Sequence, residues 1–367
     1  MNYNPLVSVI IPVEEVGPDL EQAVEYLLKQ SYQNFEILVF VTRDTGKRFA
    51  KTTIIEEKSF AGRPAEKRDL ALKYAKGDIF AFIDDDVYPS VSWLSSAVKN
   101  FEDLEVAGVG GPMLTPIEDS LMEKAGGWVW ASKLGSGGAG TYRCLPEPKR
   151  LVDDYPTANL LVRRSDFTAV GGFDSKYWPG EDTKLCLDLT KKLGKKIIYD
   201  PGALVYHHRR ALFYLHLRQI RGYGQHRGYF ARVLPETSRR LGYFLPSLFF
   251  LGTLLCPVIL GLFLISQSPL STLAMGIYGS LYSLYFFLLL ATGVWVWRKS
   301  RDWRLGLLVM PGIVVTHLYY GFMFLRGFFS QGLKRNTHPF FLQKNSWVPY
   351  AHPLETTQAC SPVIHVP

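Results

Sequence analysis

Three consecutive carboxylates, Asp84-Asp85-Asp86, directly follow an apolar run at residues 79–83. The run predicts a buried strand, and like charges at its end are unfavourable unless a cation lies among them. Hard divalent metals such as Mg²⁺ or Mn²⁺ prefer carboxylate ligands. Side chains alternate along an extended segment, so Asp84 and Asp86 would share one side. We therefore predict both as metal ligands; the alternative is a solvated loop or a helix N-cap.

A second acidic pair, Glu181-Asp182, follows the aromatic and turn-forming residues 177–180. Group transfer to a hydroxyl needs a base near the attacking oxygen, and neighbouring aromatic rings suit stacking on a sugar. The pair is therefore a candidate for a general base. The alternative is an acidic helix N-terminus, which the helix dipole favours.

Two further motifs could complete such a site. Residues 62–68, with a Gly-Arg-Pro turn, bring Lys67 and Arg68 to the start of a helix, where free N–H groups attract anions. This arrangement would suit a diphosphate, although an ordinary basic helix start has the same pattern. One imidazole of Tyr206-His207-His208 could join the metal, or the two histidines could be a surface pair.

The elements around these motifs alternate between strands and helices. Apolar runs predict strands at 7–11, stopped by Pro12, and at 36–41, 79–83 and 106–109; helical spacing predicts helices after Asp19, at 65–76 and around 91–101. This order indicates an α/β domain with a mostly parallel sheet. In such sheets ligands bind beyond the carboxyl ends of the strands, which is where Asp84–Asp86 lies.

A basic segment follows this predicted domain. Residues 209–240 contain eight Arg and one acid, Glu236, so they carry +7 of the chain's formal charge of +8. Such a belt usually contacts phosphates, either of nucleic acid or of lipid headgroups. Because the belt directly precedes a long uncharged stretch, we predict lipid headgroups and no nucleic acid.

Residues 241–297 contain no Asp, Glu, Lys or Arg, and residues 305–325 are also uncharged. One membrane helix needs about 20 apolar residues, so we predict three spans, at about 243–266, 270–297 and 305–325. A large soluble helical core is the alternative. A transporter would need ionisable groups within its spans, and only His317 lies there.

The chain begins without a signal-peptide pattern, and the loop at residues 298–301 is short and basic. Both features predict that the first ~240 residues lie in the cytoplasm, at the cell inner membrane if the protein is bacterial. Lys334 and Arg335 argue against an external C-terminus, and Pro311-Gly312 could break the third span. The four scattered cysteines indicate no metal site or disulfide. The predicted divisions are a catalytic domain (1–208), a membrane-interface segment (209–241), a transmembrane region (242–330) and a tail (331–367).

Together the motifs resemble the membrane-attached, family-2 inverting glycosyltransferases with the A-type nucleotide-sugar fold. The matching pieces are VSVIIPV, FEILVFV, GRPAEKRDLAL, AKGDIFAFIDDD, TANLLVRRSDFTAVGGFD, GEDTKLCLDL and VYHH, in the family's order over about residues 6–230. The resemblance implies that Asp182 is the general base, that Asp84 and Asp86 bind the metal, and that His208 is a late metal ligand. Thr157–Asn159 fall where the family holds the sugar or acceptor. The predicted donor-site residues are Pro12, Asp44, Lys67, Arg68, Asp84, Asp85, Asn159, Glu181 and Gln219.

Two departures from the family pattern affect the predicted specificity. Many members carry an Asp pair after the second strand that reads the base, whereas here only Asp44 is available. Processive synthases carry Gln-x-x-Arg-Trp, whereas here Gln219 is followed by Ile220-Arg221-Gly222-Tyr223. The second departure weakens a prediction of processive polymerisation.

The sequence thus predicts metal-dependent transfer of a sugar from a nucleoside-diphosphate sugar to a polyprenyl-linked or other lipid-linked acceptor at the cytoplasmic face. Inversion would follow from a single displacement, in glycan or polysaccharide assembly. The alternatives are a processive polysaccharide synthase and a catalytically inactive, membrane-bound module that binds sugar nucleotides.

Overall fold

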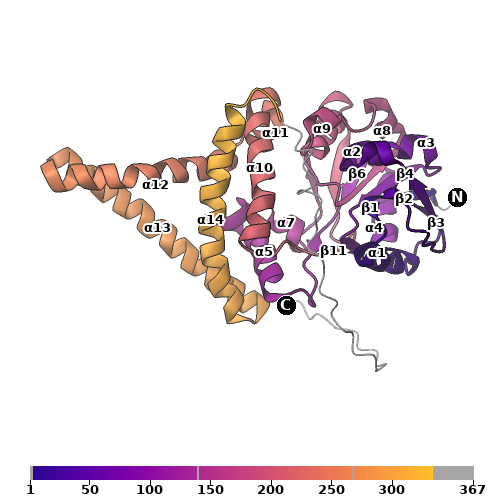
Figure 1. Ribbon diagram of the computed structural model, residues 1–367, viewed down its shortest axis with the longest axis horizontal. Coiled ribbons are helices and arrows are strands. Elements are labelled where there is room, and N and C mark those ends of the chain that lie inside the picture. The colour runs from indigo at the N-terminus through magenta and orange to yellow at the C-terminus, as the bar shows by residue number, and fades with distance from the viewer. Residues whose placement is uncertain (1–2, 139, 267, 334–367) are drawn as a thin grey trace. The chain divides into compact units, whose positions relative to one another are not determined.

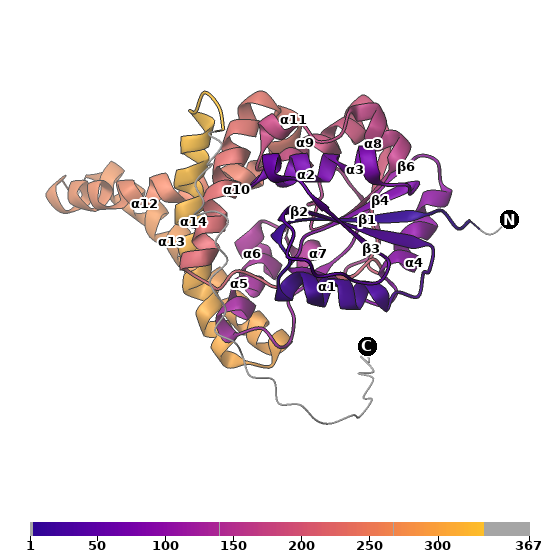
Figure 2. The same cartoon turned by 45° about the vertical axis from the view of Figure 1, so that its right-hand side comes forward.

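An eight-stranded sheet forms the centre of the N-terminal part (Figures 1 and 2). The computed structural model describes residues 3–138, 140–266 and 268–333. The strand order is β3-β2-β1-β4-β9-β6-β10-β8, and only β9 and β8 run antiparallel to their neighbours. The predicted mostly parallel α/β domain is therefore confirmed. The strands are β1 (Val7–Glu15), β2 (Phe35–Arg43), β3 (Thr52–Glu56), β4 (Ile79–Ile83), β6 (Val106–Gly110), β8 (Arg150–Val152), β9 (Asn159–Arg163) and β10 (Lys196–Tyr199).

Helices cover both faces of this sheet, as the continuously apolar strands require. One buried cluster joins the sheet to α1 (Pro18–Leu28) and α4 (Trp93–Val98). A second cluster joins the opposite face to four short helices. They are α2 (Pro64–Asp69), α3 (Ala71–Tyr74), α8 (Arg164–Val170) and α9 (Glu181–Leu187).

Three predicted boundaries were wrong. β1 continues through Pro12, which lies opposite Phe40 of β2. A proline is tolerated there because β4 pairs with β1 only as far as Ile10, so beyond that point β1 has one partner, as an edge strand does. The helix predicted at 65–76 is divided into α2 and α3. The helix predicted at 91–101 ends earlier and continues as a 3₁₀ turn.

A small three-stranded sheet lies beyond the main one. It contains β5 (Val87–Pro89), β7 (Met113–Leu114) and β11 (Val205–His207), and β11 is its central strand. Because β11 pairs with β5, the histidine pair is brought to the segment that follows Asp84–Asp86. Four irregular helical turns complete this part: Lys58–Phe60, Lys99–Glu102 and Ser175–Tyr177 are 3₁₀ turns, and Asp188–Lys192 is a π turn.

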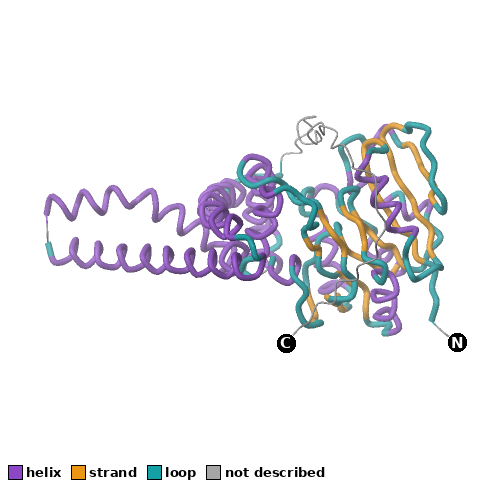
Figure 3. Tube along the Cα trace, turned by 90° about the horizontal axis from the view of Figure 1, so that it is seen from below, coloured by secondary structure: helices purple, strands orange, loops and turns teal. Residues whose placement is uncertain are grey.

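The remaining elements are helices. Three of them, α12, α13 and α14, are long and apolar enough to cross a membrane, and α12 and α13 form a hairpin that extends away from the others (Figures 1 and 3). The predicted tail, with Lys334, Arg335 and Cys360, lies outside the described residues from position 334 onward. The helices are α5 (Leu121–Ala131), α6 (Lys133–Ser136), α7 (Thr141–Cys144), α10 (Tyr214–Val233), α11 (Pro235–Ser238), α12 (Leu241–Ser266), α13 (Pro269–Ser300) and α14 (Trp303–Phe328).

Candidate active site

Arg68 joins the two acidic motifs. Its Nη2 donates to Asp84 Oδ1 at 2.6 Å and its Nη1 donates to Glu181 Oε1 at 3.2 Å. Arg68 and Glu181 are both buried, and Phe173 covers one side of the guanidinium. Asp84 and Glu181, which lie about 100 positions apart in the sequence, thus contact the same side chain. The carboxylates after β4 and those that open α9 therefore belong to one site.

The chain turns after β4 instead of remaining extended. The N–H of Val87 donates to the carbonyl of Asp84 at 3.2 Å, which closes a turn. Asp84 contacts Arg68, whereas Asp86 contacts Arg210 Nη2 through Oδ2 at 3.1 Å. Because alternation of side chains holds only for an extended segment, it does not apply across this turn, and a shared side for Asp84 and Asp86 stays a prediction.

His207 is the imidazole beside the acidic cluster. Its Nε2 lies 3.6 Å from Asp86 Oδ1, and pairing of His207 with Val87 across β11 and β5 fixes this position. Burial lowers the pKa of His207 to about 3, so the ring is neutral and can offer a lone pair. His208, the predicted ligand, instead contacts Asp119 Oδ1 (2.6 Å) and Gln22 Oε1 (2.9 Å).

These donors suit a hard divalent cation in type. Carboxylates from Asp84 and Asp86, with a neutral imidazole, form the kind of mixed O/N set that binds Mn²⁺ or Mg²⁺. Among the described residues no three His, Cys, Asp or Glu side chains converge as a ready-made metal site. Binding would thus require the arginine contacts of the two carboxylates to rearrange. His208 as a ligand stays a prediction.

Lys67 is buried and points toward the ends of β1 and β2. Its Nζ donates to the carbonyl of Val13 (2.6 Å), to Glu14 Oε1 (2.8 Å) and to Thr42 Oγ1 (2.7 Å). Burial lowers the pKa of Lys67, although Glu14 opposes that effect. The contacts give Lys67 a structural part in joining α2 to the sheet, and its predicted contact with the nucleotide stays a prediction.

The other predicted donor-site residues lie at different depths. Asn159 is fully buried: its amide donates to the carbonyls of Gly111 (2.7 Å) and Ala203 (2.8 Å) and accepts from Trp93 Nε1 (2.8 Å). Asp44 follows β2 and pairs with Arg48 at 2.8 Å. Asp85 lies within the turn after β4, beside Asp84. Pro12 is buried in β1, and Gln219 lies on α10, far along the chain from both.

Of the acidic pair that opens α9, Glu181 is buried and Asp182 is partly exposed. Burial, reinforced by Asp182, raises the pKa of Glu181 to about 7. Burial and the nearby Asp154 raise the pKa of Asp182 to about 6. A carboxylate with a pKa near the working pH can accept a proton and release it again. Asp182 therefore has the protonation behaviour expected of a general base.

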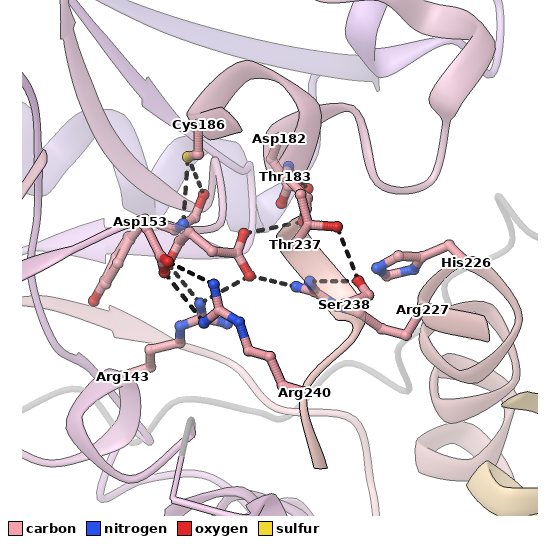
Figure 4. Close-up of polar contacts among 12 residues, drawn as sticks. Arg143, Asp153, Asp182, Thr183, Cys186, His226, Arg227, Thr237, Ser238 and Arg240 are labelled. Carbon is pink, nitrogen blue, oxygen red and sulfur yellow. Dashed lines mark hydrogen bonds and ion pairs between the residues drawn. The ribbon is translucent and has the colours of Figure 1, made fainter. Parts of the chain in front are cut away.

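A buried ion-pair network lies next to Asp182 and Thr183 (Figure 4). Asp154 Oδ1 accepts from Thr183 Oγ1 at 3.0 Å, and Asp154 Oδ2 pairs with Arg227 of α10. Arg143 contacts the same carboxylate at 3.4 Å. Burial alone would raise the pKa of Asp154, but Arg227 and Arg143 hold it below its usual range. The network connects α10 to the residue that follows Asp182.

Helix α10 lies beside the start of α9. Gly180 lies so close to it that a Cβ would come within 2.7 Å of the Phe230 ring and 2.9 Å of His226. Burial and the carboxylate of Asp182 raise the pKa of Tyr223, also on α10, to about 12. The ring of Tyr223 packs edge-on against Trp130 of α5 at 5.4 Å between centroids. Tyr223 of α10 is thus an aromatic side chain near Asp182, and stacking of the predicted residues 177–178 on a sugar stays a prediction.

Comparison with known families is consistent with this geometry. The description "Glycosyl transferase family 2" matches residues 8–122, and "Glycosyl transferase family group 2" matches residues 79–298, which is more than half of the chain. The chain belongs to glycosyltransferase family 2. The matched ranges cover β1–β4, the acidic turn, α9 and α10.

Individual family members resemble parts of the chain. A pre-mycofactocin glycosyltransferase of Mycobacterium tuberculosis is 34% identical over 148 residues, which are 40% of this chain and 30% of that protein. An uncharacterized glycosyltransferase of Bacillus subtilis, EpsJ, is 28% identical over 118 residues, 29% of this chain and 34% of that protein. The chain thus spans about a third of the length of the curated relatives it matches.

A solved structure shares the fold. The mannosyltransferase PcManGT from Pyrobaculum calidifontis, in complex with GDP-Man and Mn²⁺, matches with a TM-score of 0.51 and 18% identity over 86% of this chain and 88% of that one. The likeness establishes the A-type architecture expected of this glycosyltransferase.

Sequence reasoning missed three contributors to this glycosyltransferase site. Arg210 and Arg227 lie in the basic belt, which was predicted to contact lipid headgroups, yet both turn inward to carboxylates. Asp154 was passed over because Asp153-Asp154, directly after β8, matches no motif and its partners Arg143 and Arg227 lie elsewhere in the chain.

Proposed function

We propose that this protein transfers a sugar from a nucleoside-diphosphate sugar to a lipid-linked acceptor at the cytoplasmic face of a membrane, in glycan or polysaccharide assembly. Membership of family 2 supports the reaction class. The observation that carries the proposal is the Arg68 bridge, which holds Asp84 and Glu181 on one guanidinium. Donor-binding and proton-accepting groups thereby border the same space.

The donor would bind at the carboxyl ends of β1 and β4. Asp86 and Asp84, with His207 or His208, would hold a divalent cation, and PcManGT was solved with Mn²⁺ and GDP-Man. Such a cation, when bound, stabilises negative charge on the departing nucleoside diphosphate. Once the carboxylates are so engaged, Arg210 and Arg68 are released to contact the diphosphate oxygens, for which guanidinium geometry is suited.

Asp182 would accept the proton of the acceptor hydroxyl. That hydroxyl attacks the anomeric carbon on the face opposite the nucleoside diphosphate, the new C–O bond forms as the old one breaks, and the configuration inverts. General-base help typically contributes about 10²–10⁴-fold. Side chains of α10 near Asp182, among them Tyr223, would limit the access of water to the proton transfer. Thr183 and Asp154 would keep the helix end in position.

The acceptor would be presented by the membrane. Asp182 stands against α10, and α10 packs on the apolar α14. A headgroup at the bilayer surface would thus approach the base from the α10 side. Lys and Arg near an anionic surface each contribute about 1 kcal/mol of attraction, which favours a polyprenyl phosphate or diphosphate over a soluble sugar.

The test is nucleotide release from a panel of sugar nucleotides, with Mn²⁺ and either a membrane lipid extract or soluble sugars. We expect one or a few donors to be consumed, and the lipid extract to raise the rate well above that with soluble sugars. Equal rates with soluble sugars would refute the lipid acceptor. No release with any donor would instead favour an inactive binding module. Gel analysis of the product length separates single transfer from processive synthesis, which the missing Gln-x-x-Arg-Trp pattern disfavours.

A further inference from the structure

Helix α14 runs alongside α10 in the same direction over most of its length. Residues in and just before α10 contact residues of α14 that lie about 100 positions later in the sequence, so the two helices are parallel (Figure 1). Glycines bring the backbones together: a Cβ at Gly228 would lie 2.0 Å from the Phe324 carbonyl, and one at Gly327 would lie 2.0 Å from the Gln225 carbonyl. The matched pairs are Leu212 with Gly312, His216 Nε2 with Thr316 Oγ1 at 2.9 Å, Gly224 with Met323, and Gly228 with Phe324.

Helix α10 cannot follow α14 into a bilayer. It carries Arg218, Arg221, Arg227 and Arg232, and charged side chains at bilayer depth are costly. Arg227 is also fixed to Asp154 in the sheet domain. If α14 crossed the bilayer along its length, its parallel partner would be drawn into the hydrocarbon with these charges.

The sheet domain holds α14 from another side. Val129 of α5 packs on Gly312, and His317 Nε2 contacts the carbonyl of Leu134 in α6 at 3.1 Å. One buried cluster includes Ala125, Val129, Leu212, Val309 and Ile313. Accordingly 39% of the most apolar stretch of α14 is buried, against none for α12 and 6% for α13.

The hairpin of α12 and α13 differs from α14 in its direction and its exposure. Viewed along α10 and α14, it extends sideways from them (Figure 3). Its helices have 26 and 32 residues, about 39 and 48 Å at 1.5 Å per residue, enough to cross a hydrocarbon core of about 30 Å. Both of its open ends are basic, with Arg239 and Arg240 before α12 and Arg298 and Lys299 closing α13. The positive-inside tendency places these two ends on one side.

We propose that only α12 and α13 span the membrane, and that α14 lies along its surface on the same side as the sheet domain. The exposed large apolar side chains are Trp303, Leu307 and Phe322 of α14, and Phe329 directly after it. At about 100° per residue they fall within one stripe; Arg304 lies at one edge of the stripe and Arg326 lies just beyond the same edge. An apolar stripe with arginines along one edge suits the headgroup–acyl boundary of a bilayer.

Cysteine labelling in sealed vesicles tests this topology without requiring activity or a known donor. In a full-length chain whose native cysteines are replaced by serine, Ser266→Cys marks the hairpin tip, Ser300→Cys the start of α14 and Gln331→Cys its end. A membrane-impermeant maleimide is added to vesicles of either orientation, and detergent-solubilised samples show that each thiol can react. We expect positions 300 and 331 to be labelled from the same side and position 266 from the opposite side.

Labelling of position 331 from the side of position 266, alone or in addition to the other side, would overturn the proposal and restore three spans. A fusion of a fluorescent protein that folds only in the cytoplasm, placed after residue 367 of the unaltered chain, gives a second readout that does not depend on cysteine replacement. Fluorescence equal to that of a fusion before residue 1 is expected. A dark C-terminal fusion beside a fluorescent N-terminal one would contradict the proposal.

Discussion

The acidic cluster after β4 and the one that opens α9 are joined by Arg68 but differ in how their charge is stabilised. Asp84 and Asp86 each have an arginine within hydrogen-bond distance, at 2.6 and 3.1 Å. Glu181 is buried and Asp182 is partly exposed, and their pKa values are raised to about 7 and about 6. In the proposed function the first cluster would exchange an arginine partner for a metal ion, and the second would accept a proton.

In the proposed function this difference allows two neighbouring clusters to carry out separate tasks, metal binding and proton transfer. Charge compensation is a property of Asp84 and Asp86, whose partners Arg68 and Arg210 come from different elements. Glu181 and Asp182 are instead distinguished by raised pKa values, of which desolvation is the largest cause. Substitutions in one cluster should therefore have effects distinct from substitutions in the other.

Asp182→Asn removes the proposed base and leaves a side chain of the same size. We expect turnover to fall about 10²–10⁴-fold, or roughly 3–5 kcal/mol of barrier, because the acceptor hydroxyl then attacks without help. Nucleotide release with the preferred donor measures the loss. Asp188→Asn, at the other end of the same helix and paired with Lys184, is the matched control and should stay close to wild type. Near-normal turnover of Asp182→Asn would show that Asp182 is not the general base.

Arg68→Gln separates the two clusters. It leaves buried Glu181 and part-buried Asp84 without their shared cation, and breaking a buried pair typically costs about 3–5 kcal/mol. Urea or thermal unfolding in detergent should therefore show a large loss of stability. Arg43→Gln, which removes an exposed pair with Glu15, should cost less than about 1 kcal/mol. Similar stabilities for the two variants would mean that Arg68 is not the connection between the clusters.

Arg227→Gln tests whether α10 tunes the base. Arg227 lowers the pKa of Asp182, and Asp154 raises it; without Arg227 the Asp154 charge is less compensated. The pKa of Asp182 should then rise, and the acid limb of the turnover–pH profile should move to higher pH. Arg232→Gln, on the same helix but in contact with Ser330, should leave the limb in place. If turnover falls by the same factor at every pH and the acid limb does not shift, Arg227 has only a structural role.

Wild-type turnover should itself depend on pH in a defined direction. The base acts when deprotonated, and its pKa is raised to about 6 by burial and Asp154. Turnover should therefore be reduced below pH 6, rise through the range of the coupled Glu181–Asp182 pair and level off above about pH 7. A profile that is flat from pH 5 to 8, with donor saturation maintained, would contradict a base with a raised pKa.

Much of this organisation could be predicted from sequence because it follows from local pattern. The apolar run at 79–83 and the acids after it were enough to place Asp84–Asp86 at the edge of a parallel sheet. The path after the strand was not predictable, because pairing of β5 with β11, more than 100 residues apart, causes the turn. The same pairing selects His207 as the neighbour of Asp86.

The arginines of residues 209–240 show a second limit of prediction from sequence. In sequence, residues 209–240 form one basic belt, and composition alone cannot tell an arginine that faces lipid from one that faces a buried carboxylate. Arg210 and Arg227 are assigned only when the folded chain places Asp86 and Asp154 opposite them. Likewise, the uncharged run at 305–325 predicts a span, whereas the packing of α14 on α10 depends on glycine spacing in both helices.

The most direct test is calorimetric titration of the preferred sugar nucleotide, with and without Mn²⁺, into the wild type, Asp86→Ala and Asp182→Asn, alongside turnover of each. We predict that Asp86→Ala loses the Mn²⁺-dependent part of donor binding, while Asp182→Asn binds the donor almost as the wild type does yet turns over at least 100-fold more slowly. Equal loss of donor binding in both variants would contradict the division of labour between the two clusters.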